Sequence, residues 1–179
     1  MTLMVALLRG VNVGGHGTLP MADLRAIATD LGYGDVATYI QSGNLVLSSS
    51  TAAATVAREL ADAIAAATSV SPAVMVRTRR QLAKVVHDSP LLARGEDAAH
   101  LHVLFTDGPA TAAVAGLELD RYAPEEAIPV GKELHLLLPG GVGRSRLAID
   151  LGRRKGAAGT MRSWRTVTTL LAMVDEAAS

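Results

Sequence analysis

The chain has 179 residues, of which 49% are hydrophobic and 19% charged, enough for a packed core and too few charges for a disordered chain. Its 17 basic and 17 acidic residues cancel, and the lack of cysteine excludes disulfides and thiolate chemistry. No apolar run approaches the roughly 20 residues that span a bilayer, and the N-terminus lacks a basic signal-peptide region, so we expect a soluble, cytoplasmic protein without membrane contact.

Residues 1–78 follow the order strand, helix, strand, strand, helix, strand. Leu3–Leu8 is a continuous apolar run, which is typical of a strand buried on both faces. A tight turn at residues 42–44 joins two further strand-like runs, and apolar residues recur at helical spacing after Pro20 and after Thr51. The predicted strands are Leu3–Leu8, Val36–Gln41, Leu45–Leu47 and Ala73–Arg77, and the predicted helices span residues 20–31 and 51–67.

Residues 79–179 repeat most of this order. A connecting helical segment at 79–93, broken at Ser89-Pro90, comes first, and Pro129 suggests an edge strand. The final helix is expected to bury Trp164. The predicted strands are His100–Phe105, Asp120–Ile128 and Glu133–Leu138, and the predicted helices are Pro109–Leu117, a short helix capped by Ser145, and Arg162–Glu176.

The repeated order predicts an α+β protein built by duplication. Two β-α-β-β-α-β units are typical of ferredoxin-like folding, in which an antiparallel sheet carries helices on one face. We expect ferredoxin-like subdomains over residues 1–78 and 79–179, the second with the terminal helix, forming one compact unit. In this topology the loop after the first strand and the hairpin between the second and third strands lie at the same end of the sheet.

Residues 9–19, RGVNVGGHGTL, form the first candidate site. Four glycines within eight positions indicate a bent backbone, or one that a ligand approaches closely, and Arg9 and Asn12 stand among them. The glycine spacing approaches that of a phosphate-binding loop, but His16-Gly17 replaces the Lys-Ser/Thr pair that such a loop needs. The alternative is that the glycines only allow a wide strand-to-helix turn.

Our leading hypothesis is a binding protein for a small anionic or nucleotide-like ligand, held where this loop meets the hairpin at residues 41–44. Arg9 would pair with the anion, and nearby side chains and backbone amides would orient the ligand by hydrogen bonds. On this hypothesis, alanine at Asn12 or Gln41 costs little stability. The predicted ligand-binding residues at this end of the sheet are Arg9, Asn12, Gly14, Gly15, Tyr39, Gln41 and Asn44.

A second glycine cluster, at residues 140–147, places Arg144 at the start of a helix capped by Ser145, which is a further candidate anion site. Its alternative is a glycine turn before a solvated basic helix. Seven basic residues against one acid between Arg144 and Arg165 give a second hypothesis, nucleic-acid binding, although few aromatic residues are available for base stacking. A third hypothesis is an enzyme of unrecognised mechanism, without a recognisable catalytic spacing.

Three histidines, His100, His102 and His135, fall on strands that should be neighbours. Three imidazoles could hold a zinc ion, but an open sheet face places polar residues outward at this spacing anyway. No carboxylate is placed to orient them. We therefore expect no metal and no cofactor, and the sequence leaves open whether the chain forms a homodimer.

Four stretches together resemble the domain-of-unknown-function family 1697 in order and spacing. They read RGVNVGG…LPMADLR, LGYGDVATYIQSGNLVL, GRSRL and TMRSWRTVTTL, and the first two are the most specific. Ser163 and Arg165 flank Trp164 where the family usually carries Asn on both sides. The resemblance runs over nearly the whole chain, implies a duplicated ferredoxin-like arrangement, and supplies no established activity.

Overall fold

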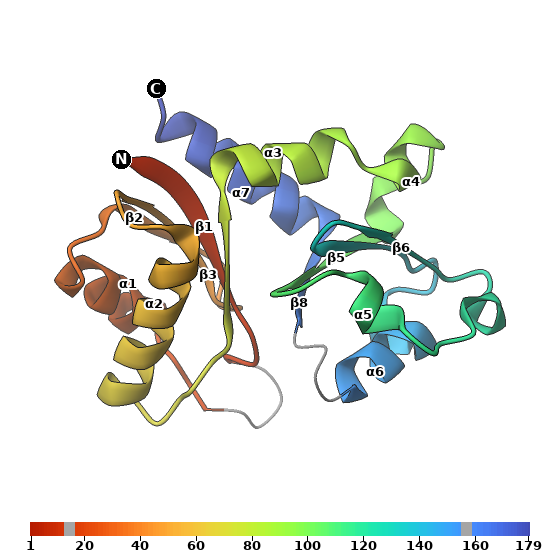
Figure 1. The fold of residues 1–179 in the computed structure, drawn as a ribbon, viewed down its shortest axis with the longest axis horizontal. Helices are drawn as coiled ribbons and strands as arrows, with labels where there is room; N and C mark the ends of the chain where they lie inside the picture. The colour runs from red at the N-terminus through yellow and green to blue at the C-terminus, as the bar shows by residue number, and fades with distance from the viewer. Residues whose placement is uncertain (13–16, 155–158) are drawn as a thin grey trace. The chain divides into compact units, whose positions relative to one another are not determined.

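The computed structural model describes residues 1–12, 17–154 and 159–179 (Figure 1). The predicted α+β class is confirmed, because two four-stranded antiparallel sheets pack against helices, as in duplicated ferredoxin-like units. Contacts within the chain divide it into two units, residues 1–84 with 169–179, and residues 85–168. The division therefore falls inside two helices, the one at Arg79–His87 and the last one.

The first unit has the sheet order β2-β3-β1-β4, and every neighbouring pair is antiparallel. Its strands are β1 Thr2–Leu8, β2 Gly34–Tyr39, β3 Asn44–Ser49 and β4 Val74–Thr78, and its helices are α1 Met21–Asp30 and α2 Ala53–Ala67. Met4, Ala6 and Leu8 of β1 join the apolar core with residues of both helices. Val5 and Leu7 point to the opposite face and are buried as well, which explains the continuous apolar run.

The second unit repeats this topology with the sheet order β6-β7-β5-β8. Its strands are β5 Leu101–Thr106, β6 Glu126–Val130, β7 Glu133–Leu137 and β8 Gly159–Ser163, its helices are α5 Thr111–Val114 and α6 Arg146–Arg153, and its 3₁₀ turns are η1 Ala98–His100, η2 Leu119–Tyr122 and η3 Val142–Arg144. Three further helices are α3 Arg79–His87, α4 Pro90–Ala93 and α7 Trp164–Glu176. The predicted break at Ser89-Pro90 is confirmed, because Ser89 caps α4 by accepting a hydrogen bond from the Leu92 amide at 3.4 Å.

Strand β8 was absent from the sequence-based pattern, which assigned part of it to the last helix. Thr160 and Arg162 alternate on it where a buried strand would be expected to carry apolar residues, yet both are buried. The Arg162 guanidinium donates hydrogen bonds to Thr160 Oγ1 at 2.6 Å and to the Met161 carbonyl at 2.8 Å. These local hydrogen bonds pair part of the buried Arg162 guanidinium. Hydropathy alone predicts no charged side chain at this position.

The duplication extends into the helix that follows each fourth strand. Arg77 on β4 pairs with Val5, and Arg162 on β8 pairs with Val103, at the matching place of each sheet. The next residue, Thr78 or Ser163, ends the strand, and the helix begins directly after it. The repeated unit is therefore β-α-β-β-α-β-α.

The same side-chain chemistry caps both of these helices. The Gln81 amide donates to Thr78 Oγ1 at 3.3 Å, and the Thr78 amide donates to Gln81 Oε1 at 2.9 Å, which is a capping box. The Thr166 amide donates to Ser163 Oγ at 3.3 Å in the second copy. A hydroxyl at this position satisfies an otherwise unpaired amide of the first helical turn.

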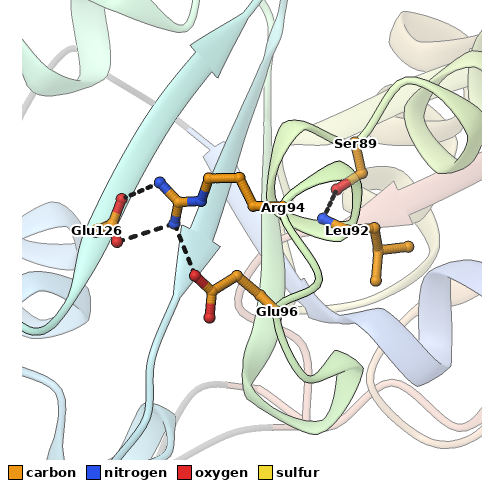
Figure 2. Close-up of polar contacts among 5 residues, drawn as sticks. All are labelled: Ser89, Leu92, Arg94, Glu96 and Glu126. Atoms are coloured by element: carbon orange, nitrogen blue, oxygen red, sulfur yellow. Dashed lines mark hydrogen bonds and ion pairs between the residues drawn. The ribbon is translucent and has the colours of Figure 1, made fainter.

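Strand β6 lies at the edge of the second sheet, in agreement with the edge position that Pro129 suggested. The two guanidinium nitrogens of Arg94, which follows α4, each donate at 2.9 Å to the Glu126 carboxylate on this strand (Figure 2). A further bond of 3.0 Å joins Arg94 to Glu96. Charged groups and a proline thus shield this edge from pairing with another strand.

The Arg94–Glu126 contact predicts a pH-dependent contribution to stability. Hydrogen bonds from Arg94, with its charge, lower the pKa of the Glu126 carboxyl, so these bonds stabilise the fold only while Glu126 is ionised. We expect Arg94→Gln to lower the free energy of unfolding slightly at pH 7, since both groups are largely exposed, and the difference to shrink as the pH falls below about 4.3 and through the lowered pKa of Glu126. Denaturant titrations at pH 7 and pH 3 measure it, and a difference as large at pH 3 as at pH 7 would indicate packing by Arg94 instead.

Candidate functional site

The loop after β1 and the hairpin between β2 and β3 meet at one end of the first sheet. We call residues 9–12 with residues 41–44 the loop–hairpin junction. The Leu8 amide donates to the Gly43 carbonyl at 2.8 Å, and the Asn12 side chain donates to the Gln41 carbonyl, also at 2.8 Å. The topology therefore brings together the two stretches that the sequence singled out.

The Asn12 side chain holds this junction together. Its Nδ2 donates to the carbonyls of Leu19 and Gln41, and its Oδ1 accepts from the Leu19 amide, each at 2.8 Å. The residue adopts φ 55°, a left-handed conformation that asparagine tolerates better than most residues. Both N–H groups of the amide are used within the protein, so Asn12 acts by positioning the loop.

Asn44 and Gly43 close the hairpin from inside the fold. Asn44 is fully buried, and its Nδ2 donates to the Tyr39 carbonyl and to Ser42 Oγ, both at 3.0 Å. Gly43 has φ 78°, and an added Cβ would lie 2.5 Å from Val11 Cγ2 and 2.8 Å from Leu8 Cβ. Only glycine therefore lets the turn approach the loop so closely.

The groups that remain available to a ligand are fewer than the sequence suggested. Arg9 is half-buried, its amide donates to the Ala73 carbonyl at 2.9 Å, and its guanidinium has no partner among the described residues. The Gln41 side chain is exposed, and Tyr39 is half-buried at the end of β2. Gly14 and Gly15 lie outside the described residues.

These contacts change the stability expected of the Asn12 variant. We expect Asn12→Ala to lower the free energy of unfolding by about 2–3 kcal/mol, because three hydrogen bonds are lost and the Leu19 amide is left unpaired. Gln41→Ala should stay within about 0.5 kcal/mol, since only the Gln41 backbone takes part in the junction. Chemical denaturation of both variants measures the contrast, and equal stabilities would contradict the role assigned to Asn12.

The second candidate anion site, at Arg144 and Ser145, is already supplied with an anion by the protein. Ser145 is fully buried, caps α6 as predicted, and accepts from the Ala148 amide at 2.8 Å. The Glu125 carboxylate accepts from the Leu147 amide at 2.9 Å, in the first turn of the same helix. Arg144 is exposed nearby in η3. An external anion would compete with Glu125, a partner that no spacing in the sequence revealed.

Part of the basic segment from 144 to 165 takes part in the fold of the second unit. Burial lowers the pKa of the Arg162 guanidinium to about 10, and this side chain lies within β8. Arg154 donates to the Ala115 carbonyl, and Arg153 lies 4.0 Å from Asp150. Lys155 lies outside the described residues. Some of the basic side chains that suggested a nucleic-acid surface therefore have partners within the second unit or are buried in it.

The three histidines do not converge. His100 lies in η1 rather than on the strand. His102 pairs with Leu136 and His135 with Val103, so these two imidazoles project from opposite faces of the sheet. Among the described residues, no three His, Cys, Asp or Glu side chains form a cluster able to hold a metal ion.

His135 predicts acid sensitivity. Burial lowers its pKa, so the folded protein favours the neutral imidazole, and stability falls as the pH drops below about 6.5, where the unfolded chain takes up a proton first. The matching position of the first sheet holds Val46, so an apolar residue fits there. We expect His135→Leu to flatten the stability profile between pH 7 and pH 5 in denaturant titrations. His87→Gln, at an exposed histidine, is the control and should keep the parent profile.

The fold and its junction define an α+β protein of two ferredoxin-like units, with a glycine-rich loop tied to a hairpin in the first unit. A family model described as "Protein of unknown function (DUF1697)" matches residues 1–135, and the chain belongs to this family.

The chain is also similar in structure to a conserved bacterial protein, SP0830 from Streptococcus pneumoniae. The TM-score is 0.78 at 24% sequence identity, over 97% of this chain and 98% of the other. At this identity the likeness establishes the fold alone. The comparison with curated proteins gives no match. No helix among the described residues has the length and apolarity needed to cross a bilayer.

Proposed function

We propose that the first unit binds a small anionic or nucleotide-like ligand at the loop–hairpin junction. The observation that carries this proposal is a difference between the two copies of the repeat. Twelve residues, 9–20, connect β1 to α1, whereas four residues, 107–110, connect β5 to α5. Long connections between elements of a compact domain are commonly functional.

The extra residues of the first loop are not needed to close the sheet. The Leu8 amide donates to the Gly43 carbonyl at 2.8 Å in the first unit, and the Thr106 amide donates to the Lys132 carbonyl at 3.0 Å in the second. The same hydrogen bond therefore joins the first strand to the hairpin in both copies. The short connection satisfies this topology, so the length of the first loop calls for another explanation.

The charge at the junction favours an anion. Arg9 follows β1 directly, and Asp107 follows β5 at the matching place, so the two copies carry opposite charges there. The Arg9 guanidinium has no partner among the described residues, and a guanidinium pairs bidentately with phosphate or carboxylate oxygens. Gln41 would add a neutral donor and acceptor from the hairpin.

The remaining predicted residues take supporting roles in this proposal. Asn12 and Asn44 hold the backbone on which Arg9 and Gln41 stand, since their amide donors already serve main-chain and hydroxyl oxygens. Tyr39 ends β2 beside this turn. The amides of Gly14 and Gly15 stay a prediction from the sequence.

The proposal is tested by titrating the protein with AMP and with inorganic pyrophosphate and measuring the binding of each by calorimetry. We expect Arg9→Gln to weaken binding about tenfold or more, because a hydrogen-bonded ion pair contributes roughly 1.5–3 kcal/mol. Arg58→Gln, which removes an exposed arginine from α2, is the matched control and should bind as the parent does. Equal losses in the two variants, or no binding of either probe at millimolar concentration, would overturn the proposal.

The same variants separate this function from nucleic-acid binding through residues 144–165. A nucleic-acid surface would bind duplex DNA with an affinity that falls steeply with salt and does not respond to Arg9→Gln. That result, together with loss of binding in Arg144→Gln, would favour the second hypothesis.

A further inference from the structure

Ile40, the residue between Tyr39 and Gln41, is unfavourable for the fold in two respects. The residue is 51% exposed although its side chain is large and apolar. Its backbone has φ 47°, a left-handed conformation that β-branched residues rarely adopt. Stability alone would favour Gly, Asn or Asp at such a place.

The rest of the described chain follows that expectation. Its other non-glycine residues with positive φ are Asn12 and Asp35, the residue types that tolerate this conformation best. The turn does not depend on the Ile40 side chain either, since Asn44 and the close packing of Gly43 hold it. A strained, exposed apolar residue that the fold does not need points to a role in recognition.

The position of Ile40 links it to the proposed anion site. It directly precedes Gln41, whose carbonyl accepts the Asn12 hydrogen bond of 2.8 Å, so the loop–hairpin junction and Ile40 share one turn. We infer, resting on the proposed function, that the ligand is an organic phosphate with a flat apolar ring, of the nucleoside monophosphate class. Arg9 pairs with the phosphate, and the Ile40 side chain packs against the ring.

The surroundings of Ile40 favour a small ring over a protein surface. Among the described residues of the first unit, only Met1 is another large hydrophobic residue with comparable exposure. A stable protein interface buries about 800 Å² on each partner, mostly around several apolar anchors. A single exposed isoleucine, in the turn that carries Gln41, suits a small ring instead.

The test compares three probes, AMP, ribose 5-phosphate and inorganic phosphate, on the full chain by calorimetry. We expect AMP to bind about tenfold more tightly than the two probes without a base, from burial of apolar area against Ile40. Ile40→Asn should remove this preference and leave the affinity for ribose 5-phosphate unchanged. Its melting temperature should equal or exceed that of the parent, because Asn suits φ 47° better.

Ile149→Asn is the control, since Ile149 is 44% exposed on α6 in the second unit, and it should bind all three probes as the parent does. Equal binding of AMP and inorganic phosphate that depends on Arg9, with no effect of Ile40→Asn, would overturn this inference and leave the anion site standing. A lowered melting temperature for Ile40→Asn would assign Ile40 to the fold. Failure of all three probes to bind would overturn both proposals.

Discussion

The bridge made by the Asn12 side chain is the constraint on which the first unit's candidate site depends. Its amide hydrogen-bonds to the main chain of Leu19, just before α1, and to the carbonyl of Gln41, in the turn of the hairpin. These two segments belong to different elements, and the Asn12 side chain hydrogen-bonds to both. Because an amide presents donors and an acceptor in one plane, one side chain can bond to main-chain groups of both segments at once. Arg9, Ile40 and Gln41 stand on the backbone next to these bonds.

The two copies of the repeat separate what the fold requires from what one unit has added. Both keep the same strand order, the same bond from the first strand to the hairpin, and a hydroxyl cap on the helix after the fourth strand. The long glycine-rich loop and the arginine at its start belong to the first copy, which has twelve connecting residues against four. Duplication therefore supplies an internal control: features present in both copies serve the topology, and features present in one invite a functional explanation.

In the second unit, which carries the basic segment, several groups that the sequence suggested for anion binding already have partners within the protein or are buried. The first turn of α6 holds the carboxylate of Glu125, and the hydroxyl of Ser145 is committed to the helix cap. Arg162 is buried in β8, where desolvation lowers its pKa. A helix N-terminus and a run of arginines attract anions, but a folded chain satisfies them first with its own groups where these are within reach.

The sequence by itself determined the order of strands and helices along the chain. Apolar runs of strand length, helical spacing, the turn at Gly43, the break at Ser89-Pro90 and the cap at Ser145 are local signals that act over a few residues. They predicted the duplicated α+β fold and the meeting of loop and hairpin. Only the tertiary structure decided which polar side chains stay available. Asn12, Asn44 and Ser145 have the chemistry of ligand-binding residues, yet each is hydrogen-bonded within the fold. The strain at Ile40 and the placement of Glu125 are equally invisible in the sequence. The reason is physical: a polar group near the core must find a partner, and for Asn12 and Glu125 that partner lies 29 and 22 residues away along the chain, where no local pattern records it.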